Sequence, residues 1–201
     1  MNLIKHIPKL FVKKDKKAKE LLESIHNDTG VWWDNIEDFG KRMRLAGAVE
    51  QSSTGKGSEK VDEQFPVKHH FEGGLYTREI FMPKGSIVVS LIHKQNHPSF
   101  LLEGEVSFIN DKGEVNKIKT GAKIFTKIGT QRVLYIHKDT RWVCVYKTDK
   151  KNAKDAMNDV YADHWMELPK EFLKNYFKQQ KNYYGRSLFR YECWNLSSFR
   201  C

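Results

Sequence analysis

Two histidines, His93 and His97, are the residues whose type and spacing most clearly suggest chemistry. Neutral imidazoles are good ligands for zinc, iron, copper or nickel, and both side chains could converge inside one fold. Two ligands make a weak site, so a third would have to come from elsewhere, and His69 or His70 are the candidates. The sequence admits a divalent metal ion as a cofactor, although we expect none to be bound.

Other common catalytic patterns do not occur in the sequence. The segment GKGS at 55–58 lacks the second glycine of a phosphate loop at the right distance and is not framed by a strand and a helix. Cys144, Cys193 and Cys201 are odd in number and widely spaced, which argues against a disulfide framework or a zinc cluster and suits a reducing compartment. No nucleophile elbow and no second carboxylate–histidine constellation is present.

The charge balance favours anionic neighbours. The 201 residues include 35 Lys plus Arg against 25 Asp plus Glu, for a net charge of +10, which attracts nucleic acid, acidic protein surfaces or membrane surfaces without choosing among them. Basic residues gather near both ends of the chain: Lys13, Lys14, Lys16, Lys17, Lys19, Lys174, Lys178, Lys181 and Arg186. Solvated helix faces are the simpler explanation, so nucleic-acid binding through the basic ends ranks as the third hypothesis.

The N-terminal stretch MNLIKHIPKLFVKKDKK bears on localisation. It has neither the uninterrupted apolar run of a signal peptide nor the length of a membrane span. We expect a soluble chain made in the cytoplasm of the producing cell, with no membrane span and no secretion by a signal peptide.

Composition and periodicity divide the chain into four zones. Residues 1–50 form a predicted N-terminal arm of two helices, because apolar residues recur at helical spacing, and Asp28 or Thr29 is placed to cap the second helix. Residues 51–64 are small and polar, as in a flexible linker. Residues 149–201 form a predicted helical C-terminal extension that ends in an aromatic, arginine-rich stretch.

Residues 65–148 are the predicted β-barrel. Short runs rich in β-branched and aromatic residues follow one another: YTREIF, SIVVSLIH, SFLLEGEVSFI, EVNKIKT, KIFTKI, RVLYIH and RWVCVYKT. Turn signals separate them, and NDKG at 110–113 is the clearest hairpin. The expected fold is mainly β, a single antiparallel barrel with helical flanks, and α+β overall.

The segments PKGSIVVSLIHKQNHPSFLLEGEVSFINDKG and TGAKIFTKIGTQRV resemble the two motifs of the cupin superfamily, which are small jelly-roll barrels. In that family the first motif runs glycine, a His-x-His strand, glutamate and glycine, and the second runs glycine, proline-x-glycine and histidine. The turn glycines are the firmest part of the resemblance: Gly85, Gly104, Gly121 and Gly129.

The resemblance implies a rewritten metal site. It places Leu91 at the first histidine of the family, His93 at the second, His97 at the glutamate and Arg132 at the last histidine, with Lys127 at the proline. Leucine has no donor atom, and arginine stays protonated at any relevant pH. The alternatives are a bound metal, a histidine–arginine pocket that holds an anion or nothing, and a misplaced alignment.

Arg132 admits two interpretations. A guanidinium that faces the barrel interior between two histidines suits a carboxylate or phosphate, which it grips with two parallel hydrogen bonds. In the alternative, which we slightly prefer, Arg132 pairs with Glu79, Glu103 or Glu105 and ties strands together. If Arg132 points inward, strand alternation turns His137 outward, so His137 is a poor ligand candidate.

The phrases YTREIFMPKG, LLEGEVSF and GTQRVLYIHKDTRWVCVYKT also look like the small cupin-like proteins of tailed bacteriophages. Their pattern puts Lys or Arg where the second-motif histidine would stand. This resemblance implies a barrel used as a building block, either in the virion or during its assembly.

Three functions compete. The first is a non-catalytic structural or assembly protein of a bacteriophage particle, forming a homo-oligomer and contacting other virion proteins. The second is a small metal-dependent dioxygenase, isomerase or lyase, with Tyr135 or Glu103 as acid–base groups. For the first, large aromatics are candidate interface residues, with core packing against the barrel as the alternative: Trp32, Trp33, Trp165 and Trp194.

Overall fold

The computed structural model describes residues 15–26, 32–45, 63–110 and 113–184. It contains two compact units that divide after Trp165. Some predictions concern residues outside these ranges. They include Asp28, Thr29, Trp194 and nearly all of the linker at 51–64. The division into arm, linker, barrel and extension stays a prediction.

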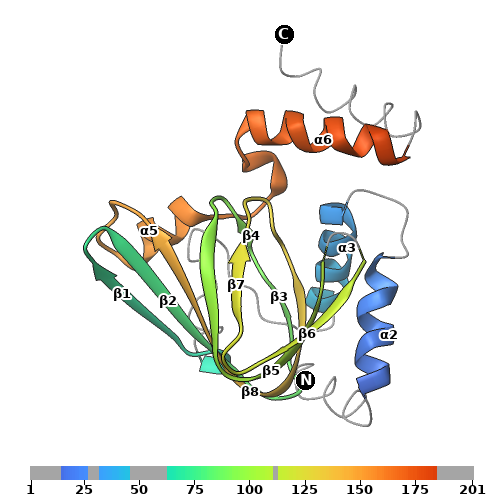
Figure 1. Ribbon diagram of the computed structural model, residues 1–201, viewed down its shortest axis with the longest axis horizontal. Helices are drawn as coiled ribbons and strands as arrows, with labels where there is room; N and C mark the ends of the chain where they lie inside the picture. The colour runs from blue at the N-terminus through green and yellow to red at the C-terminus, as the bar shows by residue number, and fades with distance from the viewer. Residues whose placement is uncertain (1–14, 27–31, 46–62, 111–112, 185–201) are drawn as a thin grey trace. The chain divides into compact units, whose positions relative to one another are not determined.

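One antiparallel sheet dominates the first unit (Figure 1). Its seven strands follow the order β1-β2-β8-β5-β6, with β3 paired to β8 and β7 paired to β5. The strands are β1 (Val67–Glu72), β2 (Leu75–Met82), β3 (Ile87–Val89), β5 (His97–Ile109), β6 (Val115–Lys119), β7 (Lys123–Thr126) and β8 (Val133–Lys147). A separate two-stranded sheet joins β4 (Ile92–His93) to β9 (Tyr161–Ala162).

Each predicted β-run contains a strand. SIVVSLIH is divided between β3 and β4, and RVLYIH and RWVCVYKT together make up most of the single strand β8. Ile109 pairs with Val115 on either side of the predicted NDKG hairpin, of which residues 111 and 112 lie outside the described residues. With its few helices, this mostly antiparallel sheet confirms the expected fold class, which is mainly β and α+β overall.

The long central strands β5 and β8 change register near Gly104. The pairing shifts between Leu101 and Val106, so that residues on both sides of the irregularity reach the same inner core although their numbers change parity. Gly104 has φ +101, and a Cβ there would lie 2.8 Å from the Cα of Thr140. Only glycine fits this close crossing of two backbones.

Matched side chains from β2, β8 and β5 form rows across the inner face of the sheet. Ile80 and Leu101 both lie opposite Trp142, and all three belong to the hydrophobic core. The next rows toward the other end of the barrel carry polar groups. Arg78 and Ser99 both lie opposite Cys144, and Tyr76 lies opposite Tyr146. The interior is therefore apolar at one end and polar at the other.

Two helices, α2 (Asp15–His26) and α3 (Trp32–Leu45), occur where the apolar periodicity predicts them. Helix α2 contacts β5, β6 and β8, the side of the barrel on which Figure 1 shows both helices. These strands carry a second set of buried residues that lies outside the inner core, including Ile109, Val133 and Tyr135. The apolar residues of the two helices that are buried include Leu22, Ile25, Trp33, Ile36 and Phe39.

After the barrel, α5 (Ala153–Val160) begins at Asn152, whose side chain accepts a hydrogen bond from the backbone N–H of Asp155. Helix α5 ends at Val160, because Tyr161 is extended and belongs to β9. The short 3-10 helix η1 (Trp165–Glu167) follows. In the second unit, α6 (Lys170–Tyr184) matches the predicted helix after Pro169. No described helix is long and apolar enough to cross a membrane.

Candidate functional site

His93 and His97 meet inside the barrel. His93 ends β4 and His97 begins β5, and the centroids of the two rings lie 4.6 Å apart. They are only 5% and 3% exposed. The chain turns between them through residues 94–96, where the Asn96 side chain accepts a hydrogen bond from the backbone N–H of Ile128. The two histidines singled out by the sequence therefore share one buried site.

Two tyrosines complete this group. The ring of Tyr146 lies 4.2 Å from that of His97, and its hydroxyl donates to the hydroxyl of Tyr161 over 2.6 Å. The Tyr146 oxygen lies 3.2 Å from Nδ1 of His93. Since the one Tyr146 proton goes to Tyr161, Nδ1 of His93 must be the donor. We call His93, His97, Tyr146 and Tyr161 the histidine–tyrosine cluster.

The second imidazole has the same tautomer. Nδ1 of His97 lies 3.2 Å from the carbonyl oxygen of Gln95. A carbonyl only accepts, so Nδ1 carries the hydrogen and Nε2 holds a lone pair. That Nε2 atom is buried and has no hydrogen-bond partner among the described residues. The cluster thus presents an unsatisfied acceptor in the barrel interior.

Two arginines lie beside the cluster. The guanidinium of Arg132 donates to the hydroxyl of Thr126 over 3.3 Å, and Thr126 is the cross-strand neighbour of His97. Arg78 projects from the polar end of β2, and its guanidinium carbon lies 5.9 Å from the centroid of the Tyr161 ring. The site is rich in positive charge.

Burial and positive charge keep both histidines neutral. Desolvation lowers the pKa of His93 well below its usual value, and His97, Arg132 and Arg78 lower it further. Desolvation, aided by Arg132, lowers the pKa of His97 to about 4 against the hydrogen bond to Gln95, which raises it. Desolvation also raises the pKa of Tyr161 to about 12. At neutral pH the cluster therefore consists of neutral imidazoles and neutral phenols.

These residues do not fit the metal that the cupin resemblance implies. Among the described residues, no group of three His, Cys, Asp or Glu side chains could hold a metal ion. Leu91, at one of the family's ligand positions, is partly buried against the apolar core. Arg132, at another, acts electrostatically on both imidazoles, and its fixed charge repels a divalent ion.

The other predicted ligands do not complete a metal site. His69 lies 2.7 Å from the hydroxyl of Tyr76 through its Nδ1 atom, and His70 is exposed. His137 lies 2.7 Å from the hydroxyl of Ser107 through its Nε2 atom. Leu134 and Ile136 belong to the inner core, as the alternation predicts, and His137 does not. Lys127 is exposed.

Other basic residues make cross-strand ties of the kind predicted for Arg132, and that role of Arg132 stays a prediction. Arg141 donates to the carboxylates of both Glu79 and Glu103, and Glu105 pairs with Lys117 and Lys138. Arg141, Lys117 and Lys138 therefore already tie these three glutamates. Arg132 instead lies against the inner face, with its guanidinium carbon 5.3 Å from the centroid of the Phe108 ring.

The acid–base candidates Tyr135 and Glu103 do not join the cluster. Tyr135 meets the ring of His137 edge-on at 4.8 Å, and its strand neighbours on that face are Ile87 and Ser107. The side chain of Glu103 is 60% exposed. Neither residue is placed to exchange a proton with His93 or His97.

Three of the four tryptophans predicted as interface residues are among the described residues, and they pack within the chain. The indole N–H of Trp33 donates to the carbonyl of Gly129 over 2.8 Å, and that of Trp32 donates to Gln131 over 3.3 Å. Trp165 stacks on Trp33 with ring centroids 5.8 Å apart. Trp32 and Trp33 are buried, so they attach α3 to the barrel, which is the core-packing alternative rather than an exposed interface.

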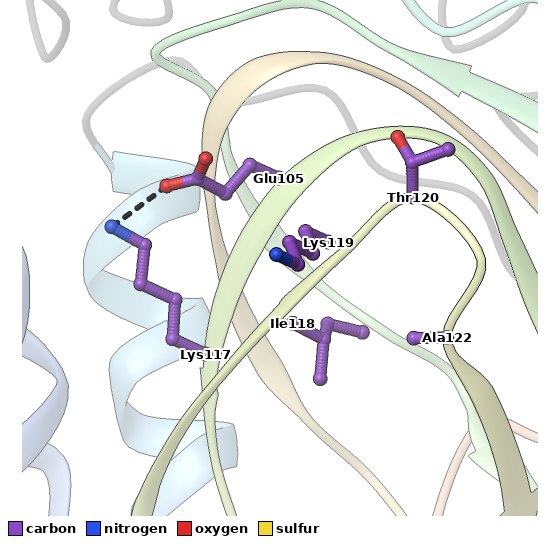
Figure 2. Close-up of a pocket in the computed structure, with 6 residues that line it drawn as sticks. All are labelled: Glu105, Lys117, Ile118, Lys119, Thr120 and Ala122. Carbon is purple, nitrogen blue, oxygen red and sulfur yellow. Dashed lines mark ion pairs between the residues drawn. The ribbon is translucent and has the colours of Figure 1, made fainter.

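A groove lies elsewhere on the barrel (Figure 2). It is lined by Glu105, Lys117, Ile118, Lys119, Thr120 and Ala122. Lys117 pairs with Glu105 over 2.7 Å, and the hydroxyl of Thr120 accepts from the backbone N–H of Gly104. None of the lining residues belongs to the histidine–tyrosine cluster. Internal contacts therefore account for the polar groups of Glu105, Lys117 and Thr120.

The sequence reasoning missed Tyr146, Tyr161 and Arg78. Strand alternation could have found two of them, since Arg78 is in phase with the inward Tyr76, and Tyr146 is in phase with Cys144. Tyr161 gave no such signal. It reaches the cluster because the short strand β9 pairs His93 with Tyr161, a contact between segments far apart in the chain.

Comparisons with known proteins address the fold. No family model matches the sequence, and no curated protein sequence matches it. Similar solved structures include ectoine synthase from P. lautus, at 15% identity over 48% of this chain and 72% of that one, with a TM-score of 0.40. The cupin domain of Schizosaccharomyces pombe Cnp3 aligns at 14% identity over 43% of this chain and 71% of that one, with a TM-score of 0.37.

A cupin 2 domain-containing protein from Halorhodospira halophila aligns at 10% identity over 45% of this chain and 69% of that one, with a TM-score of 0.38. Such low identities and TM-scores transfer no activity. The strand order and the inward rows of the sheet therefore carry the fold assignment, and cupin-domain proteins are among the structures that resemble it.

Proposed function

We propose that this chain is a non-catalytic structural or assembly protein of a bacteriophage particle, built on a cupin-type barrel with a degenerate metal site. The observation that carries the proposal is the pair of neutral histidines beside Arg132, with Leu91 turned to the core. A barrel that keeps its shape without a metal is free to act as a scaffold. The resemblance to cupin-like phage proteins supports the phage context.

Helix α3 is fixed to the barrel and enlarges the proposed scaffold. Because Trp33 ties α3 to the Gly129 carbonyl, partners would be met through other surfaces. Large apolar side chains exposed on the barrel are Leu75, Leu102 and Phe125. Phe125 is 81% exposed on β7, next to Pro98 of β5. An exposed aromatic is a suitable anchor for a second copy or for another virion protein.

Mass spectrometry of gradient-purified phage particles tests the proposal. We expect the chain in a fixed ratio to the capsid protein, and its absence from particles and assembly intermediates would refute the phage role. Light scattering of the purified full chain should show a defined oligomer. Phe125→Asp should weaken that oligomer, whereas Lys123→Asp, at an exposed position on the same strand, is the matched control.

A small metal-dependent enzyme is the second candidate. The observation that favours it is the convergence of two imidazoles, with Nε2 of His97 available as a donor. Such a site would bind a divalent metal through only two protein ligands beside a guanidinium, which is a weak arrangement. Metal content separates this candidate from the scaffold.

Nucleic-acid binding stays a third hypothesis. It rests on the net charge of +10 and on basic residues such as Lys174 and Lys178, which are exposed on α6. Affinity of this kind would fall steeply with salt and would show no sequence preference. Synthesis in the host cytoplasm before entry into the particle likewise stays a prediction.

A further inference from the structure

The acceptor on His97 is the starting point. Its Nδ1 atom is committed to the Gln95 carbonyl, so only Nε2 is available to a new partner. That atom is buried without a partner among the described residues, and the side chain is only 3% exposed. A buried acceptor without a hydrogen bond lowers stability, so a group that donates to it would be bound favourably.

The charges around His97 decide what else a ligand must carry. Arg132 lowers the pKa of His97. Arg132 and Arg78 both lower the pKa of the neighbouring His93. Arg132 is placed beside His97 through the hydroxyl of Thr126. A guanidinium grips a carboxylate with parallel N–H donors, and it repels cations. The ligand should therefore be an anion.

A suitable ligand therefore needs a hydrogen-bond donor for Nε2 of His97 and a negative charge for Arg132. We propose that the polar end of the barrel binds a small 2-hydroxy carboxylate, whose carboxylate accepts from Arg132 while its hydroxyl donates to Nε2 of His97. A plain carboxylate offers only acceptors and would leave Nε2 unsatisfied. A neutral alcohol would satisfy Nε2 and forgo the guanidinium. The two oxygen groups of a 2-hydroxy acid are close enough to address neighbouring side chains.

Lactate and propionate make a matched pair of probes, because they differ only in the 2-hydroxyl. Calorimetry on the full chain at pH 7 should show saturable lactate binding, with propionate at least about tenfold weaker. Nitrogen NMR of the histidine rings should move the Nε2 resonance of His97 on addition of lactate. Equal affinities for the two acids, or a lactate titration that leaves the His97 resonance unchanged, would overturn the proposal.

Variants place the interaction on the two named side chains. Arg132→Gln and His97→Phe should each weaken lactate binding about tenfold or more. The controls remove the same chemistry elsewhere. Arg141→Gln removes a guanidinium that pairs with Glu79 and Glu103, and His70→Phe removes an exposed imidazole.

Both controls should bind lactate as the parent chain does. If His97→Phe fails to fold by circular dichroism, Arg132→Gln and the probe pair decide the outcome. Loss of binding in Arg141→Gln equal to that in Arg132→Gln would show general charge attraction and sink the proposal. The scaffold function does not depend on this site, so the two ideas fail separately.

Discussion

The two ends of the barrel interior differ, although the same strands line both. At one end Ile80 and Leu101 flank Trp142 across β2, β8 and β5. At the other, Arg78, Ser99 and Tyr146 occupy equivalent inward positions, and the hydroxyl oxygen of Tyr146 lies 3.2 Å from Nδ1 of His93. Apolar rows lower the free energy of folding by burying surface, whereas buried polar groups cost free energy unless they are paired. We expect the polar row to contribute less to folding than the apolar row, and it is the end at which we propose that a ligand binds.

Breaking the strand crossing should have the largest effect, because it sets which residues reach each end. Gly104→Ala places a Cβ against the backbone of Asp139 and Thr140 at a positive φ, and it should lower the free energy of unfolding by about 4 kcal/mol. Urea denaturation measures this change. Gly121→Ala is the control, since its φ is +88 and nothing lies within 4 Å. A loss equal to that of the control would show that the crossing is not constrained.

Truncation in the apolar row comes next. Leu101 is 1% exposed, so Leu101→Ala should cost about 3 kcal/mol through lost burial and the cavity left behind. Ser99→Ala, two residues away in the polar row, should cost less than about 1 kcal/mol. Chemical denaturation of both variants compares the two ends directly. Equal losses would remove the distinction between a stabilising end and a binding end.

Acid should act on the polar end. The pKa of His97 falls from 6.5 to about 4 on folding, and that of His93 falls well below 6.5. Between pH 6.5 and about 4 the unfolded chain binds more protons, so stability falls as pH falls through this window. His97 alone contributes up to about 3 kcal/mol to this loss. Unfolding curves at several pH values should show it.

The matched pair for this pH effect is His97→Gln and His70→Gln. The first should flatten the acid loss, because the buried imidazole is gone, and the second should keep it, because His70 is exposed. An acid loss of the same size in His97→Gln would assign the pH dependence to other groups.

Removing the hydroxyl of Tyr146 should cost less than the Leu101 truncation or the acid loss. Tyr146→Phe takes away the acceptor of His93 Nδ1 and the donor to Tyr161, and it should cost about 1–2 kcal/mol. Tyr135→Phe is the control, since Tyr135 belongs to the other buried layer. Thermal unfolding of the two variants gives the difference.

Local signals account for what the sequence could predict. Period-two alternation and turn glycines located strands β2 to β8 but not β1, which precedes the predicted runs, and apolar spacing located the helices. Both signals depend on near neighbours in the chain. The same alternation would have placed Arg78 and Tyr146 inward. Tyr161 could not be predicted, since a two-residue strand has almost no pattern and its pairing with His93 depends on the whole fold.

Contacts between distant segments also decide what covers the tryptophans of α3, so the sequence could not predict it. An aromatic on an amphipathic helix must be covered, and the sequence does not say whether the cover comes from another chain or from its own barrel. The carbonyls of Gly129 and Gln131, which accept from Trp33 and Trp32, sit in a turn whose position depends on β7 and β8. Their availability becomes apparent only in three dimensions.

Elemental analysis of the full chain tests the central claim most directly, that the histidine–tyrosine cluster is not a metal site. The protein would be incubated with zinc, iron, copper or nickel salts, dialysed and analysed beside a His93→Ala, His97→Ala double variant. We predict far less than one metal per chain, and the same value for both proteins. Near-stoichiometric metal that disappears in the double variant would contradict the account and make the metal-dependent enzyme the better proposal.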